Sequence, residues 1–273
     1  MSMRFFVLAL SAVFLAAAGP VSTPAPGPLR IVGGPATGGC IAGAERLPTS
    51  GEGFQTIHIA HSSFWGAPPT IARVKVLGTL ARKAELADFY VEDISNPRGG
   101  PMAGGHVSHQ IGLDVDVGLD PRVKAALSDA EREAIEVASV VRGDQRAVDP
   151  ARWTPGVATL LRLAASLPDV DRILVNAAIK KQLCNEVTGD RSWLRLIRPW
   201  YGHRAHMHIS FKCPADQTEC VPMNPPPPGD GCDASLQWWF DQLDHPDPPK
   251  PGTTPRPRVL PAACKAIMAG DGK

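Results

Sequence analysis

Two short segments hold five of the eight histidines in the chain, together with two aspartates. The residues are His106, His109, Asp114 and Asp116 in the first segment, and His203, His206 and His208 in the second. Imidazole and carboxylate groups are common zinc ligands, and a catalytic site needs three of them with one position open for water. A zinc ion held in this way polarises a carbonyl group and lowers the pKa of its bound water to about 7. These residue types therefore favour metal-assisted hydrolysis.

The segments Ile111–Val117 and Ala205–Phe211 both alternate polar and apolar residues, which predicts two β-strands. Side chains two positions apart lie on the same face of a strand. The two aspartates therefore share one face of the first strand, and the HxH histidines share one face of the second. If the strands are neighbours, these groups converge beside His109. One histidine of the HxH pair then completes a metal set with His109 and Asp116, and the other is left as a base.

Each motif alone also has a simpler interpretation. Asp114 and Asp116 by themselves would more often form a solvated strand face, and a lone HxH is more often an exposed or hydrogen-bonded pair. Copper is a rival metal because Met207 lies between the two histidines, but the strand pattern points Met207 to the opposite face. A serine nucleophile has no support, since the chain lacks G-x-S-x-G. The occurrence of both motifs together favours the metal site.

The N-terminus indicates export. A single charge at Arg4 precedes an apolar run from Phe5 to about Ala18, and Gly19-Pro20 follows. This pattern predicts a signal peptide over residues 1–18, and it favours that interpretation over a membrane anchor or a buried helix. Residues 19–273 would then form a single mature domain with no transmembrane anchor.

An exported chain meets an oxidising environment, so its six cysteines are expected to form three disulfides. Zinc binding by thiolates is the weaker alternative, because no CxxC pair is present. Six cysteines allow 15 pairings, and spacing alone does not choose among them. Cys213 and Cys220 enclose only a short loop, which makes a local bond between them plausible.

The charge of the chain excludes some functions. Its 28 basic and 27 acidic residues give a formal net charge of +1, which argues against a nucleic-acid binder and against electrostatic membrane attachment. Thirteen of its 28 prolines lie between Pro214 and Pro261. Composition alone would allow a disordered linker there, but disulfides from Cys220, Cys232 and Cys264 to the body would pin it as a stiff, polyproline-like strap. The sequence does not define the oligomeric state.

Helices and strands alternate irregularly, which predicts an α+β fold with a modest, largely antiparallel sheet. Residues 19–50 are expected to be an extended lead-in. A capping-box pattern at Ser128 and Glu131 predicts a helix that continues through the apolar residues Ile135, Ala138 and Val141. Further helices are expected over 70–88, 154–167 and 177–184, and further strands over 87–91 and 171–176.

Two segments carry a family resemblance, Ser108–Asp116 (SHQIGLDVD) and Arg198–Pro214 (RPWYGHRAHMHISFKCP). Both closely resemble the penicillin-insensitive murein endopeptidases of Gram-negative bacteria. The resemblance extends through Arg172–Cys184 (RILVNAAIKKQLC) and Pro225–Cys232 (PPPPGDGC), and it covers nearly the whole mature chain. The wider group is the LAS metallopeptidases, which share the patterns HxxxxxxD and HxH. The matching residues are His109 with Asp116, and His206 with His208.

The resemblance implies roles for individual residues. It places zinc on His109, Asp116 and His208, and it makes His206 the catalytic base. It also implies that His106 and His203 lie at the cleft, where a second metal or the substrate binds, and that His203 shares the catalytic role. Asp144 is a loosely matched further metal contact. The implied disulfides are Cys40–Cys264, Cys184–Cys232 and Cys213–Cys220.

The resemblance also implies an activity, a fold and a location. The activity is zinc-dependent hydrolysis of peptidoglycan cross-links between D-alanine and meso-diaminopimelate, with L,D cross-links as further candidates. Penicillin insensitivity follows because β-lactams acylate an active-site serine, which a zinc enzyme lacks. The implied fold is a small, mainly antiparallel sheet of the LAS or hedgehog type with flanking helices. Its core covers about 50–213, and a disulfide-stapled, proline-rich C-terminal strap covers 214–273. The implied location is the periplasm.

Two other functions remain open on the sequence. One is a non-catalytic murein-binding or signalling module that keeps a zinc fold, as in the related hedgehog domain. The complete metal set and the second histidine of HxH speak for the enzyme. The other is a D,D-carboxypeptidase that removes a terminal D-alanine, since exo- or endo-specificity depends on the shape of the cleft. The match at Cys184, Cys232 and the proline-rich tail favours the endopeptidase.

Overall fold

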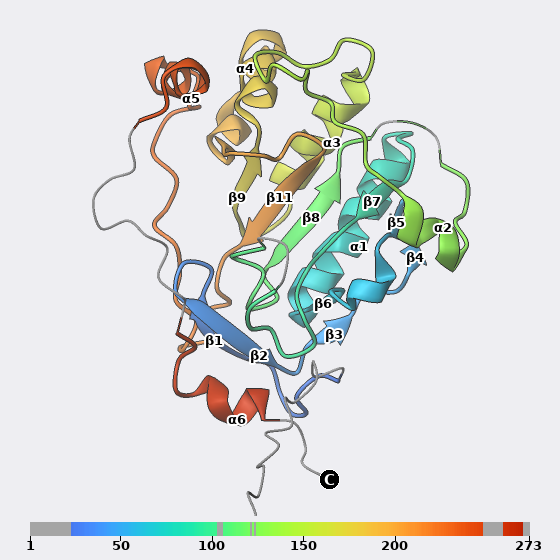
Figure 1. Ribbon diagram of the computed structural model, residues 1–273, viewed down its shortest axis with the longest axis vertical. Coiled ribbons are helices and arrows are strands. Elements are labelled where there is room, and N and C mark those ends of the chain that lie inside the picture. Colours follow the sequence, from blue (N-terminus) through green and yellow to red (C-terminus); the bar gives the residue numbers. More distant parts are fainter. Residues whose placement is uncertain (1–22, 103–105, 121, 123, 248–258, 270–273) are drawn as a thin grey trace, which may run out of the picture.

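A seven-stranded sheet of order β10-β9-β11-β8-β7-β5-β4 lies at the centre of the fold in the part of the chain that the structure describes (Figure 1). The computed structural model describes residues 23–102, 106–120, 122, 124–247 and 259–269. The strands are β4 (Ser50–Gly51), β5 (Phe54–Thr56), β7 (Phe89–Val91), β8 (Asp114–Gly118), β9 (Val170–Val175), β10 (Ile197–Pro199) and β11 (His206–Phe211). Four of the six pairings in this described sheet are antiparallel, which confirms the prediction of a largely antiparallel sheet.

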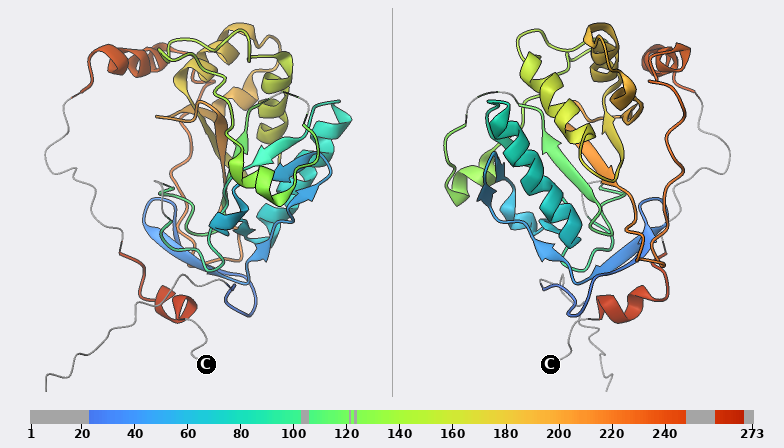
Figure 2. Two further views of the ribbon diagram at one scale, coloured as in Figure 1. Left: turned by 45° about the vertical axis from the view of Figure 1, so that its right-hand side comes forward. Right: turned by 180° about the vertical axis from the view of Figure 1, so that it is seen from behind.

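Two helices cover the apolar face of this sheet, as the view from behind in Figure 2 shows. They are α1 (Pro68–Lys83) and α3 (Pro155–Ala165), and both begin with proline in the first turn, where its missing N–H costs no hydrogen bond. The buried residues of α1 recur every three or four positions. They pack with α3 and with the apolar strand positions in one core. The opposite face of the sheet is left for polar side chains.

The helix predicted from Ser128 is shorter than expected. The capping box is present, but α2 spans only Asp129–Ala134 and Ile135 is already extended. The prediction that the helix continues to Val141 is wrong. The segment at His58 accounts for the end of α2, because its backbone N–H donates to the carbonyl of Arg132 and its ring lies 2.8 Å from the carbonyl oxygen of Ile135. Val141 instead bridges to Val148 and is buried in the core from a loop.

The region expected as an extended lead-in contains a hairpin. Strands β1 (Arg30–Gly34) and β2 (Gly38–Ala42) pair antiparallel, and most of their residues are buried. They pack with α6 (Cys264–Met268) near the end of the described chain. Strands β3 (Glu45–Arg46) and β6 (Trp65–Gly66) form a further two-stranded pair. The shorter elements are η1 (Ile59–His61), η2 (Ser192–Arg195), α4 (Ala177–Glu186) and α5 (Ala234–Asp244).

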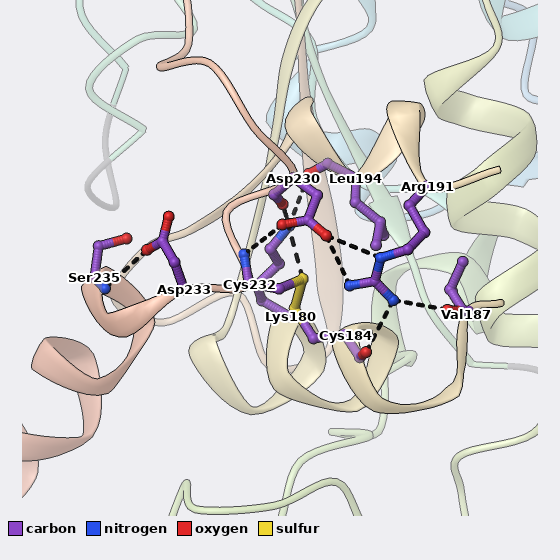
Figure 3. The surroundings of a disulfide bond; sticks show 9 residues. All are labelled: Lys180, Cys184, Val187, Arg191, Leu194, Asp230, Cys232, Asp233 and Ser235. Atoms are coloured by element: carbon purple, nitrogen blue, oxygen red, sulfur yellow. Dashed lines mark hydrogen bonds and ion pairs between the residues drawn. A yellow bond between two sulfur atoms is a disulfide. The ribbon is translucent and has the colours of Figure 1, made fainter. Parts of the chain in front are cut away.

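All six cysteines of the sequence are paired in the way that the family resemblance implied. The pairs are Cys40–Cys264, Cys184–Cys232 and Cys213–Cys220. The second bond ties the proline-rich segment to α4, and Figure 3 shows the polar contacts around it. There Arg191 donates to the carboxylate of Asp230, and its Nη1 donates to the carbonyl oxygens of Cys184 and Val187. The segment after β11 is therefore fastened to the body of the protein.

The predicted signal peptide over 1–18 lies outside the described residues. Among the residues that are described, no helix is long and apolar enough to cross a membrane.

Candidate active site

The two predicted polar strand faces meet on the open side of the sheet. β8 and β11 are antiparallel neighbours, in which His208 stands opposite Asp116 and Ser210 opposite Asp114. Met207 lies on the other face and is fully buried in the apolar core. The predicted alternation, the adjacency of the strands and the orientation of Met207 are therefore confirmed, and the last of these removes Met207 as a metal ligand.

Three nitrogen and oxygen atoms face one another at this point. His109 precedes β8, and its Nδ1 lies 2.8 Å from the carbonyl oxygen of Ile94. Because a carbonyl oxygen only accepts, Nδ1 carries the proton and Nε2 presents a lone pair. That Nε2 lies 3.0 Å from Nδ1 of His208 and 3.2 Å from Oδ2 of Asp116. Nδ1 of His208 is in turn 2.9 Å from Oδ1 of Asp116.

A second carboxylate orients His208 from behind. Nε2 of His208 lies 3.0 Å from Oδ1 of Asp114, which also accepts a hydrogen bond from the hydroxyl of Ser210. With its Nε2–H donated to Asp114, His208 turns the lone pair of Nδ1 towards His109 and Asp116. A metal-bound histidine almost always has such a partner on its other nitrogen. The three lone pairs need a shared positive charge, so these residues fit a metal ion.

The pKa shifts of His208 and Asp116 show that the cluster has more hydrogen-bond acceptors than donors. Burial lowers the pKa of His208, but hydrogen bonds to Asp114 and Asp116 outweigh burial and raise that pKa to about 10. Burial acts to raise the pKa of Asp116, whereas electrostatic interaction with His109 and hydrogen bonds from the surrounding histidines bring it well below its usual value. A proton on His208 partly balances these acceptors, and a metal cation between the three residues would balance them fully.

His106 lies at the rim of the same cluster. Its Nδ1 is 3.6 Å from Oδ2 of Asp116, and its Nε2 is 3.6 Å from Oδ2 of Asp93. The nearby carboxylates of Asp116 and Asp93 raise the pKa of His106, and burial opposes that shift. His106, His109 and Asp116 each offer one ligand atom within 4.8 Å of the others. His109 and Asp116 thus belong to both groupings, and His106 and His208 each lie close to both of them.

His206 and His203 stand next to the cluster without belonging to it. Nδ1 of His206 is 3.4 Å from the carboxylate of Glu92, and its Nε2 is 4.0 Å from Asp116. Burial lowers the pKa of His206, but Glu92 and Asp116 together raise it to about 9. His203 donates from Nδ1 to the carbonyl of Tyr201, and burial lowers its pKa to about 4, so that it is neutral at pH 7.

All but one of the site residues predicted from the sequence line a single pocket, and the exception is Asp144. A pocket of about 740 Å³ is lined by all five clustered histidines and by Asp116, a size typical of ligand-binding pockets. Asp144 does not line it. Its carboxylate accepts from the backbone N–H of Arg146 and pairs with Arg142 on an exposed loop. Within the described residues, no hydrogen bond or ion pair connects Asp144 with the cluster.

Three carboxylates at the site were missed as partners or not considered. Glu92 and Asp93 follow β7 and reach the cluster because β7 pairs with β8. Asp114 was expected on the correct face, but its role in orienting His208 was not foreseen. The polar pair directly after the strand predicted over 87–91 was the available signal for the first two, although their partners depend on long-range strand pairing.

Comparison with known proteins assigns the site to a class. The sequence matches, over residues 32–269, the profile of a peptidase family described as penicillin-insensitive murein endopeptidase. Similar relatives include the proteins of that name from Salmonella paratyphi C and Salmonella arizonae. Each is 40% identical over an alignment of 277 positions that covers 97% of this chain and 98% of the relative. The chain belongs to the penicillin-insensitive murein endopeptidase family.

Proposed function

We propose that this protein hydrolyses peptide cross-links of murein with a zinc ion held by His109, Asp116 and His208. The observation that carries the proposal is the convergence of three lone pairs, from Nε2 of His109, Nδ1 of His208 and a carboxylate oxygen of Asp116, in a pocket. When bound, zinc supplies a Lewis acid that polarises the scissile carbonyl and acidifies water. Nitrogen and oxygen donors from three residues are the set typical of catalytic zinc.

His206 is the proposed proton carrier. Its imidazole is held by the Glu92 carboxylate at 3.4 Å and faces Asp116, two strand positions before His208 on the same face of β11. With its pKa at about 9 the ring is protonated at pH 7, but a cation bound beside it would offset the carboxylates and lower that pKa. The ring would then take a proton from an attacking water and deliver it to the leaving amine. The neutral His203, whose ring centre is 5.2 Å from that of His206, offers its Nε2 lone pair to a substrate N–H in the same pocket. His106 is a further candidate contact for substrate or a second metal.

The matched family and its relatives are named murein endopeptidases, which supports a peptide bond of murein as the substrate. From the sequence resemblance, the proposed bond is that between D-alanine and meso-diaminopimelate, with L,D cross-links as a second substrate. We further infer that the fold is of the LAS type, since its HxxxxxxD and HxH residues meet at one point. Export to the periplasm is inferred from the apolar N-terminus, and the three disulfides support an oxidising compartment. Residues 19–273 are then one mature domain.

The test uses dimeric muropeptides and mass spectrometry of the products, with and without a chelator. We expect monomers from the wild type and none after chelation. His208→Ala should lose zinc and turnover together, whereas His206→Ala should keep zinc and lose turnover. Normal cleavage by His206→Ala would refute the base assignment. Release of only free D-alanine would identify a carboxypeptidase, and binding without any product would identify a murein-binding module.

A further inference from the structure

The pocket that holds the candidate metal ligands extends across the sheet to the guanidinium of Arg198. The register places Asp116, His208, Leu174 and Arg198 side by side on β8, β11, β9 and β10. Residues directly opposite each other share a face, and neighbouring strands are about 4.8 Å apart. Arg198 therefore lies about 10 Å from His208 on the same face of the sheet. Both residues line the same pocket.

No anion balances Arg198 among the described residues. Its guanidinium makes no hydrogen bond or ion pair there, although the side chain is partly buried. Its neighbours add positive charge. Burial lowers the pKa of Arg198, the charges of Arg172 and Arg195 lower it further, and only Asp233 acts in the opposite direction. Holding a partly desolvated cation among other cations costs free energy that folding does not require.

The guanidinium rests on a fastened loop. Gly231 lies against the guanidinium, since a Cβ atom at this position would come within 2.8 Å of Nη1 of Arg198, and its positive φ of 70° favours glycine. Gly231 is held on both sides, because Asp230 pairs with Arg191 and Cys232 is bonded to Cys184 (Figure 3). The loop beside the guanidinium is thereby fixed before any ligand arrives, and a preformed wall of this kind reduces the entropy cost of binding.

A second guanidinium lines the pocket beside it. Arg172 stands opposite Ser210 on β9, one row from His208. Its Nε donates to Asp171 and its Nη2 to the carbonyl of Asn224, so its orientation is fixed. Two neighbouring guanidiniums, one of them oriented by hydrogen bonds, suit an anionic group, and planar guanidinium forks match the geometry of carboxylates.

We propose that Arg198, supported by Arg172, binds a free carboxylate of the murein stem peptide and so selects the cross-linked peptide that enters the site. This proposal rests on the proposed function. The chemistry of the substrate offers two sources. The diaminopimelate residue carries a carboxylate on the carbon bonded to the scissile nitrogen, and the glutamyl residue of the stem carries another further away. Either carboxylate is a charge-assisted partner for a guanidinium.

The test compares three cross-linked peptides. One has all carboxylates free, one is amidated at the diaminopimelate carboxylate beside the scissile bond, and one is amidated at the glutamyl carboxylate. For the unmodified peptide, Arg198→Gln should lower kcat/KM by about 10- to 100-fold, mainly through KM, as expected for loss of one charge-assisted bond. For the peptide amidated at the carboxylate that Arg198 binds, the same substitution should have little further effect. The arm that shows this loss of sensitivity identifies the source.

Controls separate this proposal from the proposed function. Arg162→Gln removes the same charge from an exposed position on α3 outside the pocket and should leave kcat/KM unchanged. Arg198→Lys should restore only part of the affinity, because lysine lacks the fork. An equal loss on all three peptides, or no loss at all, would overturn the carboxylate site. If the wild type cleaves none of the peptides, the proposed function fails, and calorimetric binding of the same peptides to wild type and Arg198→Gln still decides about Arg198.

Discussion

Lys180 on α4 offers a test of how the protein tolerates a buried charge. Its side chain is fully buried, and its ammonium donates hydrogen bonds to two backbone carbonyls. Burial lowers its pKa to about 8. The charges of Arg198 and Arg191 act in the same direction, and those of Asp230 and Asp233 oppose them. The folded protein therefore releases this proton more readily than the unfolded chain.

The sign and size of the effect follow from linkage. Between a pKa of about 8 in the folded protein and 10.5 in the unfolded chain, the unfolded chain binds more protons, so stability rises with pH. The full difference corresponds to about 3 kcal/mol, which is a cost of keeping Lys180 charged below pH 8. Most of that cost should disappear between pH 8 and pH 10.

Lys180→Met removes this titration. We expect urea unfolding at a series of pH values from 7 to 10 to show a free energy of unfolding that rises by about 2–3 kcal/mol more in the wild type than in Lys180→Met. The two carbonyls that lose their donor shift the variant by a constant amount and do not change this slope. Lys181→Met, at an exposed position on the same helix, should follow the wild-type curve. Parallel curves for wild type and Lys180→Met would refute the reasoning.

Three further measurements test other parts of the structure. Replacing Cys184 and Cys232 by serine opens a cross-link between positions 48 residues apart and should lower the free energy of unfolding by about 2–4 kcal/mol in urea, so that an unchanged midpoint would contradict the assigned role. Ile209→Ala should cost about 2–5 kcal/mol by opening a cavity beneath the site, yet the zinc content by elemental analysis should stay the same. A chelator should lower the melting temperature of the wild type but not of His208→Ala, because only a bound ion stabilises the folded state. Equal shifts in both proteins would count against the site.

Local patterns in the sequence predicted the faces of the site well. A strand has a strict period of two, so Asp114, Asp116 and His208 had to lie opposite the apolar positions once the strands were recognised. The register that sets His208 opposite Asp116 is not a local property, and it follows only from the pairing of β8 with β11. The family resemblance, rather than spacing, supplied the three disulfide pairs.

The features that sequence patterns did not predict depend on contacts between residues far apart in the chain. The apolar spacing of Ile135, Ala138 and Val141 resembles a helix, but of these three only Val141 is buried, and it enters the core from a loop. The His58 segment contacts the carbonyls of Arg132 and Ile135, where α2 ends. The burial of Lys180 depends on the carbonyl of Leu194, 14 residues away, and on that of Asp230, 50 residues away. Neither partner is visible as a motif. Glu92 meets His206 for the same kind of reason.

The three disulfides are nested, and this imposes an order of assembly. Along the chain the cysteines are Cys40, Cys184, Cys213, Cys220, Cys232 and Cys264. The first pairs with the last, and the other two bonds lie one inside the other within that span. Oxidation in order of emergence would join Cys40 to Cys184, which the fold does not contain. Cys40 must therefore wait as a thiol for Cys264, or a wrong bond must be exchanged. The Cys40–Cys264 bond consequently forms only after the chain has been made as far as Cys264, and a chain cut short before that residue keeps an unpaired thiol.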